Sequence, residues 1–159
     1  MGTWQTFDTT NVSTARIARK RGSRGATPPA DRTPIVDEAL SAGMNLFDSS
    51  PMYGRAEQTL ANALEDRRDR AIIATKIWTS SPSEGREQAS HALRLFGRVE
   101  IYQVHNLVNW PAQLRMLEQL KREGKVDAIG ATHYDPRIVR SGSACSTGHR
   151  VPSQSRLSV

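Results

Sequence analysis

The sequence predicts an α/β fold in which strands and helices alternate around a parallel sheet. Short apolar stretches alternate with segments whose apolar residues recur every three or four positions, which is helical spacing. The connections between them are short, as in β-α-β units. The strands alternate only weakly between apolar and polar residues, which is typical of strands that are covered on both faces.

The predicted elements follow one another from Thr33 onward. A helix over 35–42 is ended by Gly43, because a glycine commonly follows the last helical turn. In chain order we then expect a strand at 44–48, a helix at 56–64, a strand at 71–77, a helix at 83–95, a strand at 99–105, a helix at 111–122 and a strand at 126–132. Ser83 is the expected N-cap of its helix, and Pro111 suits a first helical turn. A further strand could form near Gly2–Phe7.

The basic residues are concentrated in two flanking segments. The whole chain carries a formal net charge of +6, whereas residues 9–32 carry +5 and residues 140–159 carry +3, which leaves −2 for the remainder. Neither flank shows a helical or strand period, and neither has enough apolar residues to offset its ordering entropy. We therefore expect both flanks to be disordered and the part between them to be close to neutral.

Several classes of protein are excluded by composition. Cys145 is the only cysteine, so the chain forms no internal disulfide and has no cysteine-based metal site. No apolar run approaches the roughly 20 residues of a membrane span. The first residues lack the charged and apolar regions of a secretory signal. A cytoplasmic location without membrane association is the expectation.

Four chemically active side chains are predicted to meet in one mouth. Asp48 ends one predicted strand, Lys76 lies near the end of the next, and His105 ends the one after. Tyr53 lies in the loop just after Asp48. The carboxyl ends of parallel barrel strands converge on one face. Each residue alone has an ordinary structural explanation, such as a turn former, a surface charge, a hydrogen-bonding histidine or a packed aromatic. Their coincidence on one face favours a functional site.

Five segments of the chain resemble the aldo-keto reductase family. Residues 47–57, FDSSPMYGRAE, resemble the family signature, in which Tyr-Gly follows an Asp by five residues and Ala-Glu comes after it. Residues 74–77 and 101–105 are similar to the strands that supply the family's lysine and histidine. Residues 129–134 look like the next strand, and Gly2-Thr3-Trp4 resembles the opening segment near the nicotinamide.

The resemblance implies a partial TIM-type (β/α)8 barrel with about the first five strands. A complete barrel takes roughly 250 residues, and this chain has 159. We expect a partial reductase domain over residues 1–139, with an irregular insert at 9–32 and a disordered tail at 140–159. Both flanks are rich in Arg, Ser, Gly and Ala, so we hypothesise a truncated and frameshifted product of a GC-rich gene. Completion of the barrel by dimerisation stays open.

The implied activity is NADPH-dependent reduction of an aldehyde or ketone, without a metal. Tyr53 would act as the general acid that protonates the carbonyl oxygen as hydride reaches the carbon. A nearby ammonium favours a phenolate, so Lys76 would assist that proton transfer. Asp48 would keep Lys76 charged and oriented. His105 would hydrogen-bond the substrate oxygen.

The resemblance also implies cofactor contacts. Gly2, Thr3, Trp4 and Asp48 would approach the nicotinamide. Thr132 and His133 occupy the place where many members carry a Ser-Asn pair for the carboxamide; threonine can replace serine, whereas histidine is a departure. Trp78 would line the substrate pocket or serve as a packing aromatic.

Two other functions are kept open beside the reductase. The chain could be a degenerate fragment without catalytic activity. It could also be an anion- or nucleic-acid-binding module that uses its basic flanks. Nucleic acid is not favoured, because no aromatic residues are interleaved with the basic ones. The expected partner is a small carbonyl compound.

Overall fold

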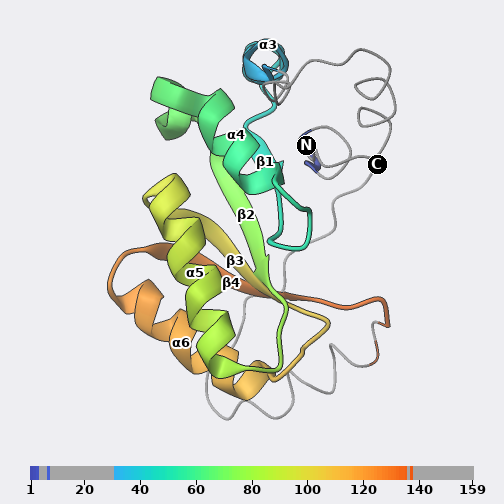
Figure 1. Ribbon diagram of the computed structural model, residues 1–159, viewed down its shortest axis with the longest axis vertical. Coiled ribbons are helices and arrows are strands. Elements are labelled where there is room, and N and C mark those ends of the chain that lie inside the picture. The colour runs from blue at the N-terminus through green and yellow to red at the C-terminus, as the bar shows by residue number, and fades with distance from the viewer. Residues whose placement is uncertain (4–6, 8–30, 136, 138–159) are drawn as a thin grey trace, which may run out of the picture.

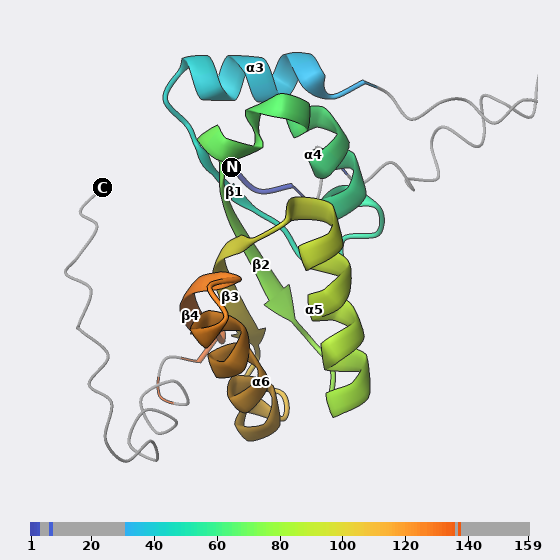
Figure 2. The same cartoon turned by 90° about the vertical axis from the view of Figure 1, so that its left-hand side faces the viewer.

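The computed structural model describes residues 1–3, 7, 31–135 and 137, and they form a four-stranded parallel sheet with helices packed on one face (Figures 1 and 2). The strand order is β1-β2-β3-β4. The strands are β1 (Leu46–Asp48), β2 (Ile72–Ile77), β3 (Val99–His105) and β4 (Val126–Thr132). Consecutive strands are neighbours and all pairs are parallel, so each connection crosses back over the sheet. This is the α/β fold class that the sequence predicts.

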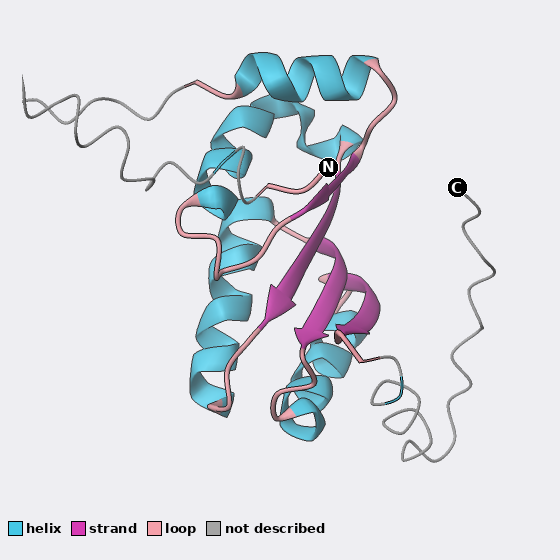
Figure 3. Cartoon of the chain, turned by 90° about the vertical axis from the view of Figure 1, so that its right-hand side faces the viewer, coloured by secondary structure: helices cyan, strands magenta, loops and turns pink. Residues whose placement is uncertain are grey.

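The connections between the strands are helical, and helix α3 precedes β1. The helices are α3 (Thr33–Ser41), α4 (Ala56–Leu64), α5 (Pro82–Phe96) and α6 (Trp110–Arg122), and the 3-10 helix η1 (Glu65–Arg70) continues α4. Helices α5 and α6 lie side by side against the sheet, and Figure 3 looks onto the opposite face, with the strands in front of the helices. The predicted helix over 35–42 corresponds to α3.

Helix α5 begins earlier than the sequence indicates. Its N-cap is Ser81, whose hydroxyl accepts a hydrogen bond of 3.3 Å from the backbone N–H of Glu84. Pro82 occupies the first turn, where a missing N–H costs nothing. The prediction of Ser83 as N-cap is therefore wrong, because Ser81 has the extended backbone that a cap requires and Ser83 already lies inside the helix.

The core fills the space between the sheet and its helices. Its largest fully buried apolar side chains include Phe47, Ile73, Ile77 and Val99 from the strands and Leu60, Leu64 and Leu117 from the helices. Burying each such side chain contributes about 1.5–3 kcal/mol. The core fixes which faces of the strands meet the helices, and thereby leaves the polar residues at the strand ends on the other side or at the rim.

The first residues of the chain extend the sheet beyond β1. Gly2 forms an isolated parallel bridge with Asp48. The backbone N–H of Asp48 donates to Met1 O at 2.8 Å, and Thr3 N–H donates to Asp48 O at 3.0 Å. The further strand expected near residues 2–7 is thus a bridge at Gly2 in the described residues, and residues 4–6 lie outside them.

Of the flanks that the sequence predicts to be disordered, 9–32 and 140–159, positions 9–30 and 140–159 lie outside the described residues, whereas Asp31 and Arg32 are described and Arg32 is the N-cap of α3. The division of the chain at residue 139 therefore stays a prediction. In the part of the chain that is described, no helix has the length and apolarity needed to cross a membrane.

Candidate active site

The sheet gathers three of the predicted residues at its carboxyl edge. Asp48 is the last residue of β1, and His105 is the last residue of β3. Lys76 is the last residue but one of β2. The strands are parallel and in continuous register, so these residues share one end of the sheet. The position of each polar residue at a strand end is what brings them together.

The ammonium group of Lys76 is held by three oxygens. Its Nζ donates to Oδ1 and Oδ2 of Asp48 at 2.8 and 2.7 Å and to the carbonyl oxygen of Ser49 at 2.9 Å. The Lys76 side chain is only 7% exposed. A buried ammonium is costly unless it is paired and hydrogen-bonded, and these contacts match its three donors. Lys76 is therefore fixed in position and orientation.

Tyr53 lies close to this ion pair. The loop that follows β1 turns back through a hydrogen bond of 3.0 Å from Tyr53 N–H to Ser50 O. The turn brings the Tyr53 ring to within 5.4 Å of Lys76 Nζ, measured to the ring centre, which is within the range of a cation–π contact. The structure thus brings Asp48, Tyr53 and Lys76 into one cluster.

His105 stands between β4 and two aromatic side chains. Its Nδ1 lies 2.6 Å from Oγ1 of Thr132. The rings of Trp78 and Tyr134 each meet the His105 ring edge-on, with centroids 6.5 Å away.

Burial lowers the pKa of His105, and the charge of Lys76 lowers it further, against the opposing effect of Asp48. At neutral pH the imidazole is therefore neutral, with one nitrogen carrying a proton and the other free to accept one.

The predicted cofactor residues occupy different environments. Gly2 is exposed and lies against Asp48 through their backbone bridge. Thr3 is fully buried, and its hydroxyl donates to Ser49 Oγ at 2.9 Å. Trp4 lies outside the described residues. Thr3 can therefore shape the site only indirectly, by holding the segment that carries Gly2.

The two predicted carboxamide ligands also have partners within the chain. The hydroxyl of Thr132 is hydrogen-bonded to His105. Nδ1 of His133 accepts a hydrogen bond of 2.9 Å from the backbone N–H of Asp135. That bond holds the His133 ring against its own turn and leaves Nε2 as the nitrogen that can reach outward.

Trp78 forms part of the rim beside His105. It is the first residue after β2, and the residue is 48% exposed. Its backbone N–H donates to Oε1 of Gln88 at 3.2 Å, which ties the loop to α5. An exposed aromatic beside His105 is suited to line a pocket, whereas the fully buried core lies elsewhere.

Three further residues of this edge were missed by the sequence analysis. Ser49 supplies the third oxygen for Lys76, and Tyr134, which is 90% exposed, forms the second aromatic contact of His105. Asn106 follows His105 with a positive φ of 52°, and its buried Oδ1 meets no donor among the described residues. An asparagine directly after a strand-end histidine was the available signal, because asparagine tolerates the left-handed region.

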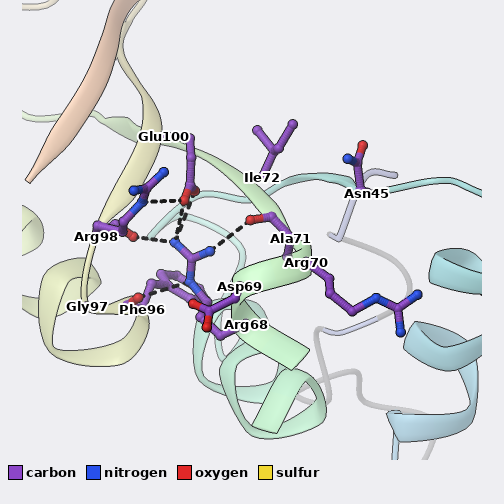
Figure 4. A pocket seen from close by; sticks show the side chains of 10 residues that line it. All are labelled: Asn45, Arg68, Asp69, Arg70, Ala71, Ile72, Phe96, Gly97, Arg98 and Glu100. Carbon is purple, nitrogen blue, oxygen red and sulfur yellow. Dashed lines mark hydrogen bonds and ion pairs between the residues drawn. The ribbon is translucent and has the colours of Figure 1, made fainter. Parts of the chain in front are cut away.

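A different cavity opens at the amino ends of the strands (Figure 4). It has a volume of about 680 Å³ and is lined by Asn45, Arg68, Asp69, Arg70, Ala71, Ile72, Phe96, Gly97, Arg98 and Glu100. Ile72 begins β2 and Glu100 is the second residue of β3, whereas the candidate site lies at the other ends of these strands. Arg68, Arg98 and Glu100 of this cavity are bonded to one another, and the cavity lies at the opposite ends of the strands, so it is not the candidate active site.

The guanidinium group of Arg68 forms hydrogen bonds at that end of the sheet. They reach the carbonyl oxygens of Phe96, Ala71 and Arg98 at 2.9, 2.8 and 2.6 Å. The same guanidinium contacts both carboxylate oxygens of Glu100 at 3.0 Å. Burial alone would raise the pKa of Glu100. A hydrogen bond from the backbone N–H of Ile73 and the guanidinium groups of Arg98 and Arg68 outweigh burial and lower the pKa.

The described residues contain no group of three or more His, Cys, Asp or Glu side chains that could hold a metal ion. The arrangement offers instead a phenol beside an ammonium, a neutral imidazole and two exposed aromatic rings. Such a site can protonate and hydrogen-bond an oxygen atom of a small organic molecule.

Comparison with solved structures first defines the class of fold. The chain is similar to a putative aldo-keto reductase from Pseudomonas aeruginosa, with a TM-score of 0.62 and 25% sequence identity over 83% of this chain and 54% of that one. A thermostable aldo-keto reductase superposes with a TM-score of 0.69 over 92% of this chain and 53% of that one, at 19% identity. The sheet and its helices thus match part of a (β/α)8 barrel.

The sequence comparison then gives the family. Residues 1–150 match the sequence model of the Aldo/keto reductase family, and the chain belongs to that family. An uncharacterized oxidoreductase of Mycobacterium tuberculosis is 30% identical over 87% of this chain and 45% of its own length. An NADH-specific methylglyoxal reductase of Escherichia coli is 26% identical over 83% of this chain and 52% of its own length. The chain spans about half the length of the curated relatives it matches.

Proposed function

We propose that this chain carries the catalytic part of an oxidoreductase site that reduces an aldehyde or ketone to an alcohol with NADPH. The observation that carries the proposal is the position of Lys76. Its ammonium is fixed by Asp48 at 2.7 and 2.8 Å and lies 5.4 Å from the centre of the Tyr53 ring. A phenol that must release a proton is assisted by a fixed positive charge, which favours the phenolate.

The proposed roles follow from that geometry. Tyr53 protonates the carbonyl oxygen as the general acid, and Lys76 stabilises the phenolate that is left. Asp48 orients Lys76. His105, kept neutral by burial, donates a hydrogen bond to the same carbonyl oxygen and so fixes its position. When bound, the reduced nicotinamide supplies the hydride that the carbonyl carbon receives.

The described residues fit a nicotinamide at this edge. Gly2 is exposed beside Asp48, and a Cβ built there would meet nothing within 4 Å, so the backbone is open to close approach. The buried Oδ1 of Asn106 needs a donor, which the amide of a carboxamide has. Thr132 and His133 stand on the neighbouring strand end. These residues, with Trp4, are the proposed nicotinamide contacts.

The choice of NADPH is the finer part of the proposal. The name of the Escherichia coli relative is that of an NADH-specific enzyme. A direct comparison is therefore part of the test. Tight NADPH binding with weak NADH binding, measured by enhancement of nicotinamide fluorescence on the purified chain, is the expected result. Equal or preferred binding of NADH would overturn the assignment of NADPH.

The catalytic proposal is tested by Tyr53→Phe, with Tyr134→Phe as a matched control. Both tyrosines lie at the same edge, but Tyr134 is 90% exposed and meets the His105 ring edge-on with centroids 6.5 Å apart. A positioned general acid contributes about 10²–10⁴-fold. Tyr53→Phe is expected to slow aldehyde reduction by that factor, and Tyr134→Phe to change it by less than about tenfold. Reduction by the Tyr53 variant at the parent rate contradicts the proposal.

A further inference from the structure

The hydroxyl of Thr132 meets the catalytic imidazole directly. Its Oγ1 lies 2.6 Å from Nδ1 of His105. The two residues are register partners, each the last residue of its strand. The backbone N–H of Asn106 also donates to Thr132 O at 2.7 Å, so a backbone bond and a side-chain bond both join the ends of β3 and β4.

We propose that Thr132 is a positioning residue that donates its hydroxyl proton to Nδ1 of His105 and thereby keeps the imidazole in the Nε2–H tautomer. Nε2 then carries the proton that points at the substrate oxygen. The kinetic part of this inference rests on the proposed carbonyl reduction, whereas the tautomer itself does not. Thr132 thus acts through His105 on the substrate oxygen, and any contact with the cofactor is additional.

The surroundings of His105 support this direction of the hydrogen bond. Among the described residues, the Thr132 hydroxyl is hydrogen-bonded to Nδ1 of His105, so its proton has an acceptor there only if Nδ1 is unprotonated. A neutral imidazole must leave one nitrogen free to accept, and the bond made by one nitrogen sets the state of the other. If Nδ1 carried the proton instead, Nε2 could not donate to a carbonyl oxygen.

The charged and titratable neighbours act on the protonation of the ring as a whole. Lys76 and His133 disfavour the imidazolium, and Asp48 favours it. Trp78 and Tyr134 meet the ring by their edges at 6.5 Å between centroids. Choice between the two neutral tautomers needs a group that touches one ring nitrogen and not the other. Thr132 is the described residue that does so.

The inference is tested by nitrogen NMR of the full chain labelled at histidine, at a pH where His105 is neutral. Correlation of ring nitrogens with ring carbon-bound protons distinguishes the two tautomers, and His105→Asn assigns the signal among the four histidines of the sequence. The parent and Thr132→Ser, which keeps the hydroxyl, should show protonated Nε2 at His105. Thr132→Val, which has nearly the same shape, should show a tautomer mixture, and Thr132→Ala should do the same.

Kinetics supply the second readout. Thr132→Val should lower kcat/KM for aldehyde reduction about tenfold, the effect of losing one oriented hydrogen bond, and Thr132→Ser should restore it. A parent His105 protonated at Nδ1, or a Thr132→Val spectrum identical to that of the parent, overturns the inference. If the spectra behave as expected and no variant reduces a carbonyl, the proposed function fails while the tautomer assignment stands.

Discussion

One ammonium group, that of Lys76, bridges both carboxylate oxygens of Asp48 at 2.7 and 2.8 Å across the ends of β1 and β2. The lysine is buried, whereas the aspartate side chain is 41% exposed. The ion pair therefore has two effects. It links the ends of β1 and β2, and it holds a positive charge beside Tyr53.

Asp48→Asn should destabilise the fold as well as the site. The substitution leaves the Lys76 ammonium buried with one neutral partner in place of a carboxylate. Breaking a buried pair costs about 3–5 kcal/mol, and the partial exposure of Asp48 reduces the expected loss to about 1–2 kcal/mol of unfolding free energy. Urea denaturation measures it. The control is Asp37→Asn, which breaks the more exposed pair of Asp37 with Arg67 and should cost less than about 1 kcal/mol. Equal losses in both variants would show that burial of Lys76 is not the cause.

His105 should stay neutral to a lower pH than a free histidine. Its pKa in the fold is lowered from 6.5 by burial and then by Lys76. The folded state binds this proton less readily than the unfolded state. The stability that neutral His105 contributes is therefore present above pH 6.5 and is lost as the pH falls through the pKa of the folded state. Titration of the His105 ring protons by NMR should give a midpoint below 6.5. A midpoint at or above that value contradicts the burial argument, and His105→Asn should flatten the corresponding acid loss of stability.

Glu57 should be a source of instability at neutral pH. It is 4% exposed in α4, and desolvation raises its pKa above 4.5 even though Thr75 donates to its Oε1 at 2.6 Å. A raised folded pKa stabilises the fold below 4.5, and this stabilisation is lost as the pH rises through the folded pKa. Glu57→Gln keeps an acceptor for Thr75 and removes the buried charge.

The expected result for Glu57→Gln is a gain of about 1 kcal/mol in unfolding free energy at neutral pH, with no gain at low pH, where the parent side chain is protonated. Urea denaturation at two pH values tests it. Glu38→Gln, on the surface of α3, is the matched control and should change stability by less than about 0.5 kcal/mol. A loss of stability in Glu57→Gln at neutral pH would mean that the ionised carboxylate is needed.

Arg68 should not be replaceable by lysine. Its planar guanidinium serves three backbone carbonyls and Glu100 at once, as Figure 4 shows, and a lysine ammonium has only three donors in a different geometry. Arg68→Lys is expected to cost about 1–2 kcal/mol, because partly buried acceptors are left without donors. Thermal unfolding measures it. Arg70→Lys, at a side chain that points away from this network, should be nearly neutral.

Gly85 should be required for the contact between α5 and α6. A Cβ at this position would lie 2.2 Å from Oε1 of Gln113, whose own amide is buried and reaches the carbonyl oxygens of Thr79 and Ser81 at 3.2 and 3.4 Å. Gly85→Ala should therefore displace the Gln113 amide from these carbonyl oxygens and cost up to about 1 kcal/mol, because the lost hydrogen bonds outweigh the higher helix propensity of alanine. Combining it with Gln113→Ala, which removes the clash, should cost less than the sum of the two single changes in a double-mutant cycle. Strict additivity would contradict the clash.

The sequence by itself determined the fold class, the order of the elements and the family. Helical spacing around Leu60 and Leu117 and the apolar stretches around Ile73 and Val104 are local patterns, and they persist because each element must bury one apolar face whatever its neighbours are. The strand-end positions of Asp48, Lys76 and His105 were equally visible, since the carboxyl ends of parallel strands always meet.

Only the tertiary structure decided which atoms touch. The third oxygen at Lys76 comes from the backbone of Ser49, and the partner of His105 Nδ1 is Thr132, 27 residues along the chain. The cap of α5 is Ser81 and not Ser83 because the backbone conformation selects it. Sequence patterns record the type and the order of residues, but hydrogen bonds depend on distances and angles that neighbouring strands and loops set together. The cluster of Asp48, Tyr53 and Lys76 was therefore predictable as a set of residues, whereas its geometry was not.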